Sequence, residues 1–366
     1  MRTIKLAIVD DSSFVRKAIQ RMLESEAEIQ IVGSASSGEE LIDNLSSWRP
    51  DIITLDLSMP GMGGLVTLDY IMAWKKIPVI ILSTHSSKDA PLTIEAMHRG
   101  AVDFIDKQQY SLVDFRALRT ILIDKIHQFA QQKVSSSSRK QFLNSADDAS
   151  AVSPLIKPRP VLSSAREYEA LVIGASTGGP PAIQQILESL GSSLPVPAAI
   201  VQHMPKGFTK AFANRLNAHL PFHVQEARDG DLFQPGTIYI GPSGNHLWLK
   251  KEKNLVYIEL SLYPDNLAHC PSVDILFSSA ALIFGEKILA VLLTGMGKDG
   301  AQGMFELAQS GAYTIAQDEE SCIVYGMPRA AVQLGAINEE LPLNKIGQRI
   351  AELLKCQAVQ KEEHPV

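Results

Sequence analysis

Short apolar runs alternate with segments of helical spacing along most of this chain, and no other feature constrains its fold as strongly. In the first 130 residues, five runs with the length of buried strands are each followed by a helical pattern. Strands joined by helical crossovers form parallel sheets with helices on both faces. We therefore predict an α/β fold with a (βα)5 doubly wound domain over residues 1–130. Its strand-like runs are residues 4–9, 29–35, 51–57, 78–83 and 102–106.

Polar residues at the starts of two helical patterns indicate where these helices begin. Ser12 or Ser13 can cap the helix that follows the first strand, because a serine side chain accepts a hydrogen bond from a free backbone amide. Ser37 is followed three residues later by Glu40, which is the spacing of a capping box. This pattern predicts a second helix that runs to Trp48.

The sequence changes character after the first domain. Ser, Ala, Pro and charged residues dominate 131–165, which predicts a flexible linker that stiffens around its prolines. Strand and helix patterns then resume, and 246–260 reads as a hairpin. We predict a Rossmann-like doubly wound α/β domain with an antiparallel hairpin edge over 166–358, and a disordered tail over 359–366.

Charge and cysteine content narrow the classes of function. Residues 1–165 carry 19 Lys and Arg against 19 Asp and Glu, whereas 166–366 carry 15 against 21. Domains that bind nucleic acids usually carry an excess of basic residues on one surface. The acidic second half therefore argues against nucleic-acid binding. The 3 cysteines show no disulfide or metal-ligand spacing, and the longest apolar stretch is too short to span a bilayer. We expect a cytoplasmic protein.

Polar residues end several predicted strands of the first domain. Asp10 and Asp11 follow the first strand, Asp56 ends the third, Ser83 ends the fourth and Lys107 follows the fifth. The carboxyl ends of parallel strands share one edge of a sheet, so these side chains should converge. Clustered carboxylates suit a hard cation such as Mg²⁺, and a carboxylate can accept a phosphoryl group. Alternatively, Asp10 and Asp11 only cap a helix, and Lys107 is a solvated charge.

This pattern resembles the receiver domain of two-component response regulators. The resemblance implies that Asp56 is the phosphoacceptor, that Asp10, Asp11 and Asp56 hold Mg²⁺, and that Ser83 and Lys107 contact the phosphoryl group. The chain departs from the family pattern after the lysine, where Gln108 replaces the usual proline, and at position 63. There Gly63 stands where many relatives carry an aspartate.

The second domain contains a serine in a glycine-rich turn. Ser176 lies between an apolar strand and a helix, within a G-x-S-x-G sequence at 174–178. This pattern is typical of a nucleophile held on a sharp strand-to-helix turn, where backbone amides can stabilise an oxyanion. A plain tight turn or a dinucleotide-binding turn would also fit. The serine occupies the second glycine position of a G-x-G-x-x-G fingerprint, which favours the nucleophile.

A base and an orienting acid can be assigned from strand ends. His203 ends the next strand, whereas His219 closes a helix, His246 begins a hairpin strand and His269 lies in a loop. Asp299 lies in the glycine-rich turn after the strand at 288–293, where it could instead cap the next helix. Nucleophile, base and acid at three strand ends favour a catalytic triad.

Several segments of the second domain together resemble the chemotaxis protein-glutamate methylesterase family. The resemblance implies a triad of Ser176, His203 and Asp299, with the backbone amides of Thr177 and Met296 as oxyanion donors. It also implies that the chain removes γ-methyl esters from glutamates of methyl-accepting chemoreceptors, deamidates receptor glutamines, and receives phosphate from a histidine kinase. The alternative is a nucleotide-binding output domain without hydrolytic activity. The matching segments are GASTGGP, QHMPKGFTKAFANRL, PSVDILF, LLTGMGKDGA and QDEESCIVYGMPRAA.

Overall fold

The computed structural model describes residues 3–83, 89–107, 115–138 and 167–362. The chain divides into two compact units, Met1–Val152 and Ser153–Val366, and each unit has its own parallel sheet. Among the described residues, no helix combines the length and the apolar character needed to cross a membrane. Most of the expected linker, residues 139–165, lies outside the described residues.

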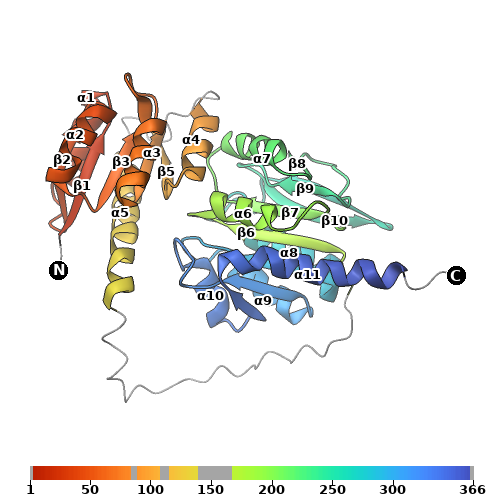
Figure 1. The fold of residues 1–366 in the computed structure, drawn as a ribbon. Helices are drawn as coiled ribbons and strands as arrows, with labels where there is room; N and C mark the ends of the chain where they lie inside the picture. Colours follow the sequence, from red (N-terminus) through yellow and green to blue (C-terminus); the bar gives the residue numbers. More distant parts are fainter. Residues whose placement is uncertain (1–2, 84–88, 108–114, 139–166, 363–366) are drawn as a thin grey trace, which may run out of the picture. The chain divides into compact units, whose positions relative to one another are not determined.

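The first unit is built on a five-stranded parallel sheet with the order β2-β1-β3-β4-β5 (Figure 1). This order confirms the predicted doubly wound fold, and the strand order reverses between β1 and β3. β3 and β4 are buried along their whole length, as expected of strands covered on both faces. The strands are β1 (Ile4–Val9), β2 (Ile29–Ala35), β3 (Ile52–Asp56), β4 (Val79–Ser83) and β5 (Asp103–Asp106).

Serine caps begin the first two helices, as the sequence predicts. The Ser12 side chain accepts a hydrogen bond from the Val15 amide, and the Ser37 side chain accepts one from the Glu40 amide. The return bond of the capping box differs from the expected pattern. The Glu40 carboxylate accepts from both the amide and the hydroxyl of Ser36, because that residue offers two donors to a single carboxylate oxygen.

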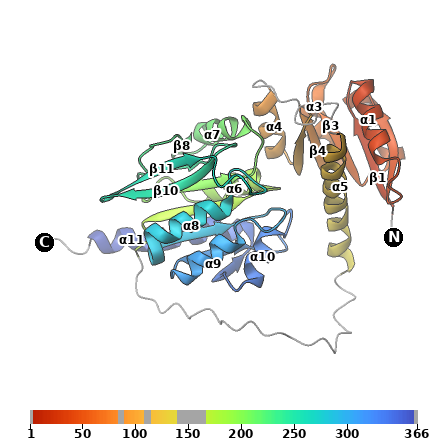
Figure 2. The same cartoon turned by 180° about the vertical axis from the view of Figure 1, so that it is seen from behind.

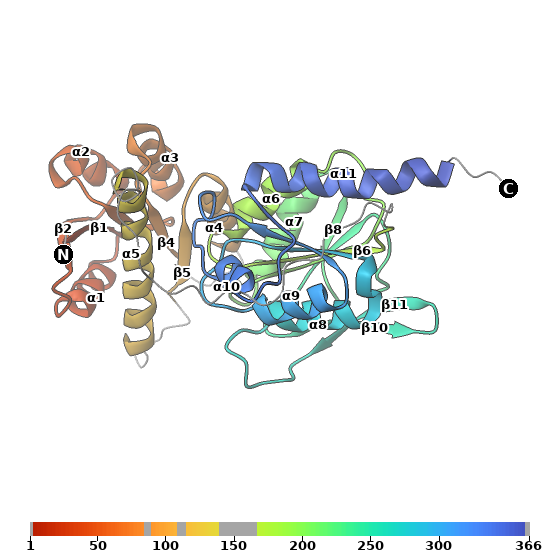
Figure 3. The ribbon, with the colours of Figure 1, turned by 90° about the horizontal axis from the view of Figure 1, so that it is seen from below.

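Helices cover both faces of the first sheet. α1 and α5 pack against each other on one face, and α2, α3 and α4 lie along the other (Figure 3). α5 continues beyond residue 130, where the sequence predicts the start of the linker. Gln and Lys in this stretch have good helix propensity, so the helix can extend beyond the part that packs on the sheet. The helices are α1 (Ser13–Leu23), α2 (Gly38–Trp48), α3 (Gly63–Lys75), α4 (Asp89–His98) and α5 (Phe115–Ser138).

The second unit contains a seven-stranded parallel sheet with the order β14-β13-β12-β6-β7-β9-β8. The predicted hairpin forms, but β10 and β11 make a separate two-stranded antiparallel sheet instead of extending the main one (Figure 2). The strands are β6 (Ala170–Ala175), β7 (Ala198–Gln202), β8 (His223–Glu226), β9 (Thr237–Ile240), β10 (His246–Glu252), β11 (Leu255–Ser261), β12 (Ile288–Leu292), β13 (Tyr313–Gln317) and β14 (Glu339–Leu341).

Two helical layers enclose this sheet (Figures 2 and 3). α6, α7 and α11 lie on one face, while α8, α9 and α10 lie on the other together with the hairpin, which packs on α8. Apolar side chains of β6, β7, β12 and α8 form the buried core between the sheet and the second layer. The helices are α6 (Gly179–Glu188), α7 (Phe208–His219), α8 (Val273–Phe284), the short 3₁₀ helix η1 (Gly285–Lys287), α9 (Ala301–Gln309), α10 (Met327–Gln333) and α11 (Leu343–Glu362).

Candidate functional sites

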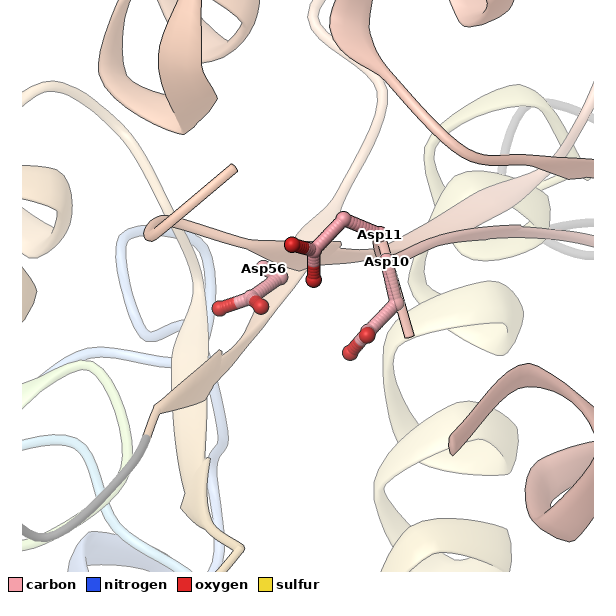
Figure 4. A group of neighbouring side chains, drawn as sticks. All are labelled: Asp10, Asp11 and Asp56. Carbon is pink, nitrogen blue, oxygen red and sulfur yellow. The ribbon is translucent and has the colours of Figure 1, made fainter. Parts of the chain in front are cut away.

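Three carboxylates meet at the carboxyl edge of the first sheet. Asp10 and Asp11 follow β1, and Asp56 ends β3, the neighbouring strand. Their ligand oxygens lie within 4.8 Å of one another, and Figure 4 shows the three side chains beside each other. Asp10 and Asp56 are buried, whereas Asp11 is exposed. The cluster therefore offers oxygen ligands of the kind that Mg²⁺ prefers, with one side open to solvent.

Lys107 lies within ion-pair distance of two of these carboxylates. Its Nζ is 2.7 Å from Oδ2 of Asp10 and 2.9 Å from Oδ2 of Asp56. Burial acts to lower the pKa of the Lys107 ammonium, but the charges of Asp56 and Asp10 outweigh burial and raise the pKa. Burial raises the pKa of the Asp10 carboxyl against the opposing effect of Lys107, and the charge of Asp56 adds to this rise. One lysine thus leaves part of the negative charge uncompensated, and a divalent cation would offset it.

Ser83 lies at the same carboxyl edge of the first sheet. It ends β4, its side chain is buried, and its hydroxyl accepts a hydrogen bond from the Thr93 hydroxyl. The backbone carbonyl of Ser83 accepts from the Lys107 amide at 2.7 Å, so the two residues are fixed as neighbours. The structure therefore brings together all five residues that the sequence singles out in this domain. Gln108 lies outside the described residues.

Ser176 lies at the carboxyl end of β6, on a tight turn into α6. Its amide donates to the Thr294 carbonyl at 3.0 Å, and the residue is partly exposed. Gly178 has a φ of +77°, and a Cβ atom at that position would lie 2.6 Å from Cβ of Ile323, so only glycine fits the turn. A Cβ atom at Gly295 would lie 2.8 Å from Cβ of Ser176. Glycines thus let two loops approach the serine closely.

His203 occupies the equivalent position on the next strand. Ala175 of β6 pairs with Gln202 of β7, so Ser176 and His203 are the next residues along two adjacent strands. The His203 amide donates to the Ala175 carbonyl at 3.1 Å, which continues the ladder to the end of the sheet. Paired strands lie about 4.8 Å apart. The serine and the histidine therefore share one edge of the sheet, on neighbouring strands.

Asp299 holds the imidazole of His203. Oδ2 of Asp299 is 2.7 Å from Nε2 of His203, and both side chains are largely buried. The other ring nitrogen, Nδ1, is buried and has no hydrogen-bond partner among the described residues. If Nε2 carries the proton that Asp299 accepts, Nδ1 has a free lone pair. The nitrogen left to act as a base is thus Nδ1.

The start of α8 fixes the Asp299 carboxylate. Oδ1 accepts from the Ser272 hydroxyl at 2.7 Å and the Asp274 amide at 3.2 Å, and Oδ2 accepts from the Val273 amide at 2.7 Å. A helix N-terminus favours negative charge, and here it belongs to a different helix from the one that follows Asp299. Burial acts to raise the pKa of Asp299. The hydrogen bond and the charge of His203, together with the hydrogen bonds from Ser272 and Val273, outweigh burial and lower this pKa well below its usual value.

The two proposed oxyanion donors lie in the loops that flank the serine. Thr177 follows Ser176 and is buried, whereas Met296 follows Gly295 and its side chain is 44% exposed. The Thr294 hydroxyl donates to the Thr177 carbonyl at 2.9 Å, which joins the two loops. Both backbone segments therefore border the serine.

Two histidines that the sequence interpretation placed outside the site belong to its surroundings. The ring of His269 stacks on His203, with centroids 4.0 Å apart and planes 18° apart. Burial and the charge of His203 lower the pKa of His269, which keeps its ring neutral at neutral pH. Nδ1 of His246 accepts from the Ser272 amide, and its Nε2 bonds to the Pro264 carbonyl. His269, Pro264 and Ser272 all lie in the loop between β11 and α8. The positions of these residues in the sequence form no motif that would have indicated the contacts.

The fold and these two sites define a class of protein: a receiver-like α/β domain with an acidic cluster, followed by an α/β domain whose sheet edge carries a serine, a histidine and an aspartate. Models of two families match the chain, the response regulator receiver domain over residues 6–117 and the CheB methylesterase over residues 171–350. The chain therefore belongs to the CheB methylesterase family, with an N-terminal response regulator receiver domain, as two near full-length relatives also show.

Both relatives are named protein-glutamate methylesterase/protein-glutamine glutaminase. The one from Halalkalibacterium halodurans is 38% identical over 96% of this chain and 99% of its own length. The one from Oleidesulfovibrio alaskensis is 41% identical over 96% of this chain and 98% of its own length. The crystal structure of the Thermotoga maritima CheB methylesterase catalytic domain matches with 41% identity and a TM-score of 0.50, and it covers 51% of this chain and 99% of that domain. These relatives do not favour the nucleotide-binding alternative.

Proposed function

We propose that this protein hydrolyses γ-methyl esters of glutamate side chains on methyl-accepting chemoreceptors, and that the same site deamidates receptor glutamines. The names of the relatives support both reactions. An ester and a primary amide of the same side chain present the same acyl group to a nucleophile. They differ in the leaving group, which is methanol in one case and ammonia in the other.

The observation that carries this proposal is the state of the His203 ring, with Nε2 held by Asp299 and Nδ1 buried without a partner. Oγ of Ser176 attacks the ester carbonyl while Nδ1 of His203 takes the hydroxyl proton. The protonated ring then gives this proton to the departing methoxide, which leaves as methanol and an acyl-enzyme. A water molecule, deprotonated by the same nitrogen, cleaves the acyl-enzyme to a glutamate carboxylate and restores Ser176.

The negative charge of the tetrahedral intermediate needs hydrogen-bond donors that are already in place. We assign this role to the backbone amide of Thr177, the residue after Ser176, and to that of Met296, the residue after Gly295, because a Cβ atom at Gly295 would lie 2.8 Å from Cβ of Ser176. Such donors act mainly on the transition state, so they raise kcat more than they lower KM.

The first domain would control this activity through Asp56, the phosphoacceptor for a histidine kinase of the chemotaxis pathway. Ser83 and Lys107 would contact the phosphoryl group. Mg²⁺ held by Asp10, Asp11 and Asp56 would neutralise the charge of the donor phosphate. The domain limits that fit this scheme are a receiver over 1–130, a linker over 131–165 and a catalytic domain over 166–358. A linker of that length permits the receiver to change position, and the cytoplasm is where the kinase and the substrate helices meet.

Methanol release from methylated receptor membranes tests this function directly. The full-length chain should release methanol, and a small-molecule phosphodonor with Mg²⁺ should increase the rate. Ser176→Ala should abolish release while the melting temperature remains close to that of the wild type. Undiminished release by this variant would remove Ser176 as the nucleophile, and wild-type protein that releases no methanol would refute the proposed substrate.

A further inference from the structure

Gln202, the last residue of β7, joins the two strands that end at the nucleophile and the base. Its side chain is buried, with 2% of its surface exposed. Its Nε2 donates to the Ser176 carbonyl at 2.9 Å and to the His203 carbonyl at 3.0 Å. An amide nitrogen carries two hydrogens, and each carbonyl takes one of them. Rotating the amide by 180° would set Oε1 against two carbonyl oxygens, so the orientation is fixed by chemistry.

The bond to the Ser176 carbonyl has a consequence for the next residue. The Ser176 carbonyl and the Thr177 amide belong to one planar trans peptide, in which C=O and N–H point in opposite directions. Fixing the carbonyl therefore fixes the direction of the Thr177 N–H. The carbonyl accepts from Gln202 and also from the Gly179 amide at 2.8 Å. Two donors together hold the plane of this peptide.

We propose that Gln202 is a positioning residue that aims the Thr177 N–H at the oxyanion of the tetrahedral intermediate. This inference rests on the proposed function, because it concerns the same reaction. The side chain does not touch the reacting atoms, and it acts through the peptide between Ser176 and Thr177. Its second bond, to His203, keeps the end of β7 at a fixed distance from this peptide.

The packing around Gln202 supports a role for its donor end. A Cβ atom at position 179 would lie 1.9 Å from Oε1 of Gln202, so glycine there leaves room for the amide. Oε1 itself is buried and has no hydrogen-bond partner among the described residues. A buried acceptor without a partner lowers stability. A glutamine that served stability alone would satisfy both ends, whereas here only the end that faces the catalytic turn is bonded.

The variant Gln202→Met tests the proposal, because methionine has a similar length and volume but no donor. Removing one oxyanion donor from a serine hydrolase lowers kcat about 10²–10³-fold, so misdirecting one donor should lower kcat about 10–100-fold. KM for methylated receptors should stay within about two-fold, since the peptide acts on the transition state. The pH at which the acid limb of kcat/KM reaches half its maximum should not move, because His203 keeps its bond to Asp299.

Gln184→Met serves as the matched control. Gln184 is also a buried glutamine, on α6, and it donates to Glu188 in its own helix. Its replacement removes a comparable amide without touching the catalytic turn, so kcat should remain at the wild-type value. Circular dichroism and melting temperature of each full-length variant show whether it folds. If Gln202→Met does not fold, Gln202→Leu also removes the donor with a smaller apolar side chain, and the same fall in kcat is expected.

Two results would overturn the inference: a kcat within about three-fold of the wild type, or a loss that comes with a displaced acid limb and disappears at higher pH. The rate at which a serine-directed phosphonate labels Ser176 separates this inference from the proposed function. The phosphonate adduct also places a polar phosphoryl oxygen at the oxyanion position but needs no receptor. If the wild type reacted with the phosphonate but released no methanol, the substrate assignment would fail. The labelling rate of Gln202→Met would still decide the role of Gln202.

Discussion

The replacement Asp299→Asn isolates the contribution of a single charge to the proposed reaction. Asparagine keeps one acceptor oxygen and exchanges the other for an NH₂ group. If the NH₂ group takes the place of Oδ1, it faces the Ser272 hydroxyl, which can rotate and accept a hydrogen bond from it. Only the longer hydrogen bond from the Asp274 amide is then lost. In the place of Oδ2 it would oppose the Val273 amide, which donates at 2.7 Å. The first orientation is favoured, so His203 should keep both its partner and its tautomer.

The expected loss then comes from the missing negative charge. Oδ2 of Asp299 lies 2.7 Å from Nε2 of His203, which places the centre of the carboxylate about 4 Å from the centre of the imidazolium charge. Opposite unit charges about 4 Å apart interact by about 4 kcal/mol at an effective dielectric constant of 20. The imidazolium forms only as the serine is deprotonated, so this energy stabilises the transition state. We therefore expect kcat to fall by about 10³-fold.

Steady-state methanol release with methylated receptor membranes measures this loss, and Ser176→Ala provides the background rate. Asp299→Ala is the companion variant. It leaves the Ser272 hydroxyl and two helix amides without an acceptor, which costs about 1–3 kcal/mol for each buried group. Its melting temperature should fall well below that of Asp299→Asn, while kcat falls at least as far. A loss of less than about ten-fold in folded Asp299→Asn would refute the view that the carboxylate charge stabilises the imidazolium.

Three further predictions concern the surroundings of the two sites. Asp56→Asn should abolish the stimulation of methanol release by a small-molecule phosphodonor, so the rates with and without donor should become equal. His269→Ala should lower kcat/KM about 2–10-fold, because a stacked ring pair contributes about 0.5–1.5 kcal/mol, whereas His269→Phe should retain most of the activity. Burial and the charge of Asp299 raise the pKa of Asp274 from 3.8 to about 6, so the folded state loses stability as pH rises between these values. Asp274→Asn should therefore raise the melting temperature above pH 6 and leave it unchanged below about pH 4, and an equal effect at both pH values would contradict this reasoning.

The positions of strands and helices could be predicted because they depend on local patterns. The apolar run at 170–175 is fully buried in the structure, and the Ser12 and Ser37 caps are where their side chains can reach free amides. The end of α5 could not be predicted in the same way. Its last eight residues, QQKVSSSS, are mostly polar and show no apolar spacing, so the sequence does not mark where the helix gives way to the linker.

The surroundings of the proposed triad could not be predicted because they depend on long-range packing. His269 reaches His203 from the loop after the hairpin, and Ser272 reaches Asp299 because α8 begins beside the loop after β12. The spacing of apolar residues in the sequence does not indicate such long-range contacts. His246 lies at the start of a strand, where its position in the sequence indicates only a hairpin, yet its ring holds the Ser272 amide.

Strand order explains why each domain places its reactive residues at one point of the sheet. In the first sheet the chain runs from β1 to β2 on one side and then returns to β3 on the other. Asp10 follows β1 and Asp56 ends β3, the two strands at this reversal. In the second sheet β7 lies on one side of β6 and β12 on the other, and Ser176 follows the central strand. The loops that leave adjacent strands at a reversal turn to opposite faces, which opens a crevice between them. Strand ends in the sequence therefore indicate which residues can react, but only the order β12-β6-β7 places the loops of Asp299, Ser176 and His203 at the same edge of the sheet.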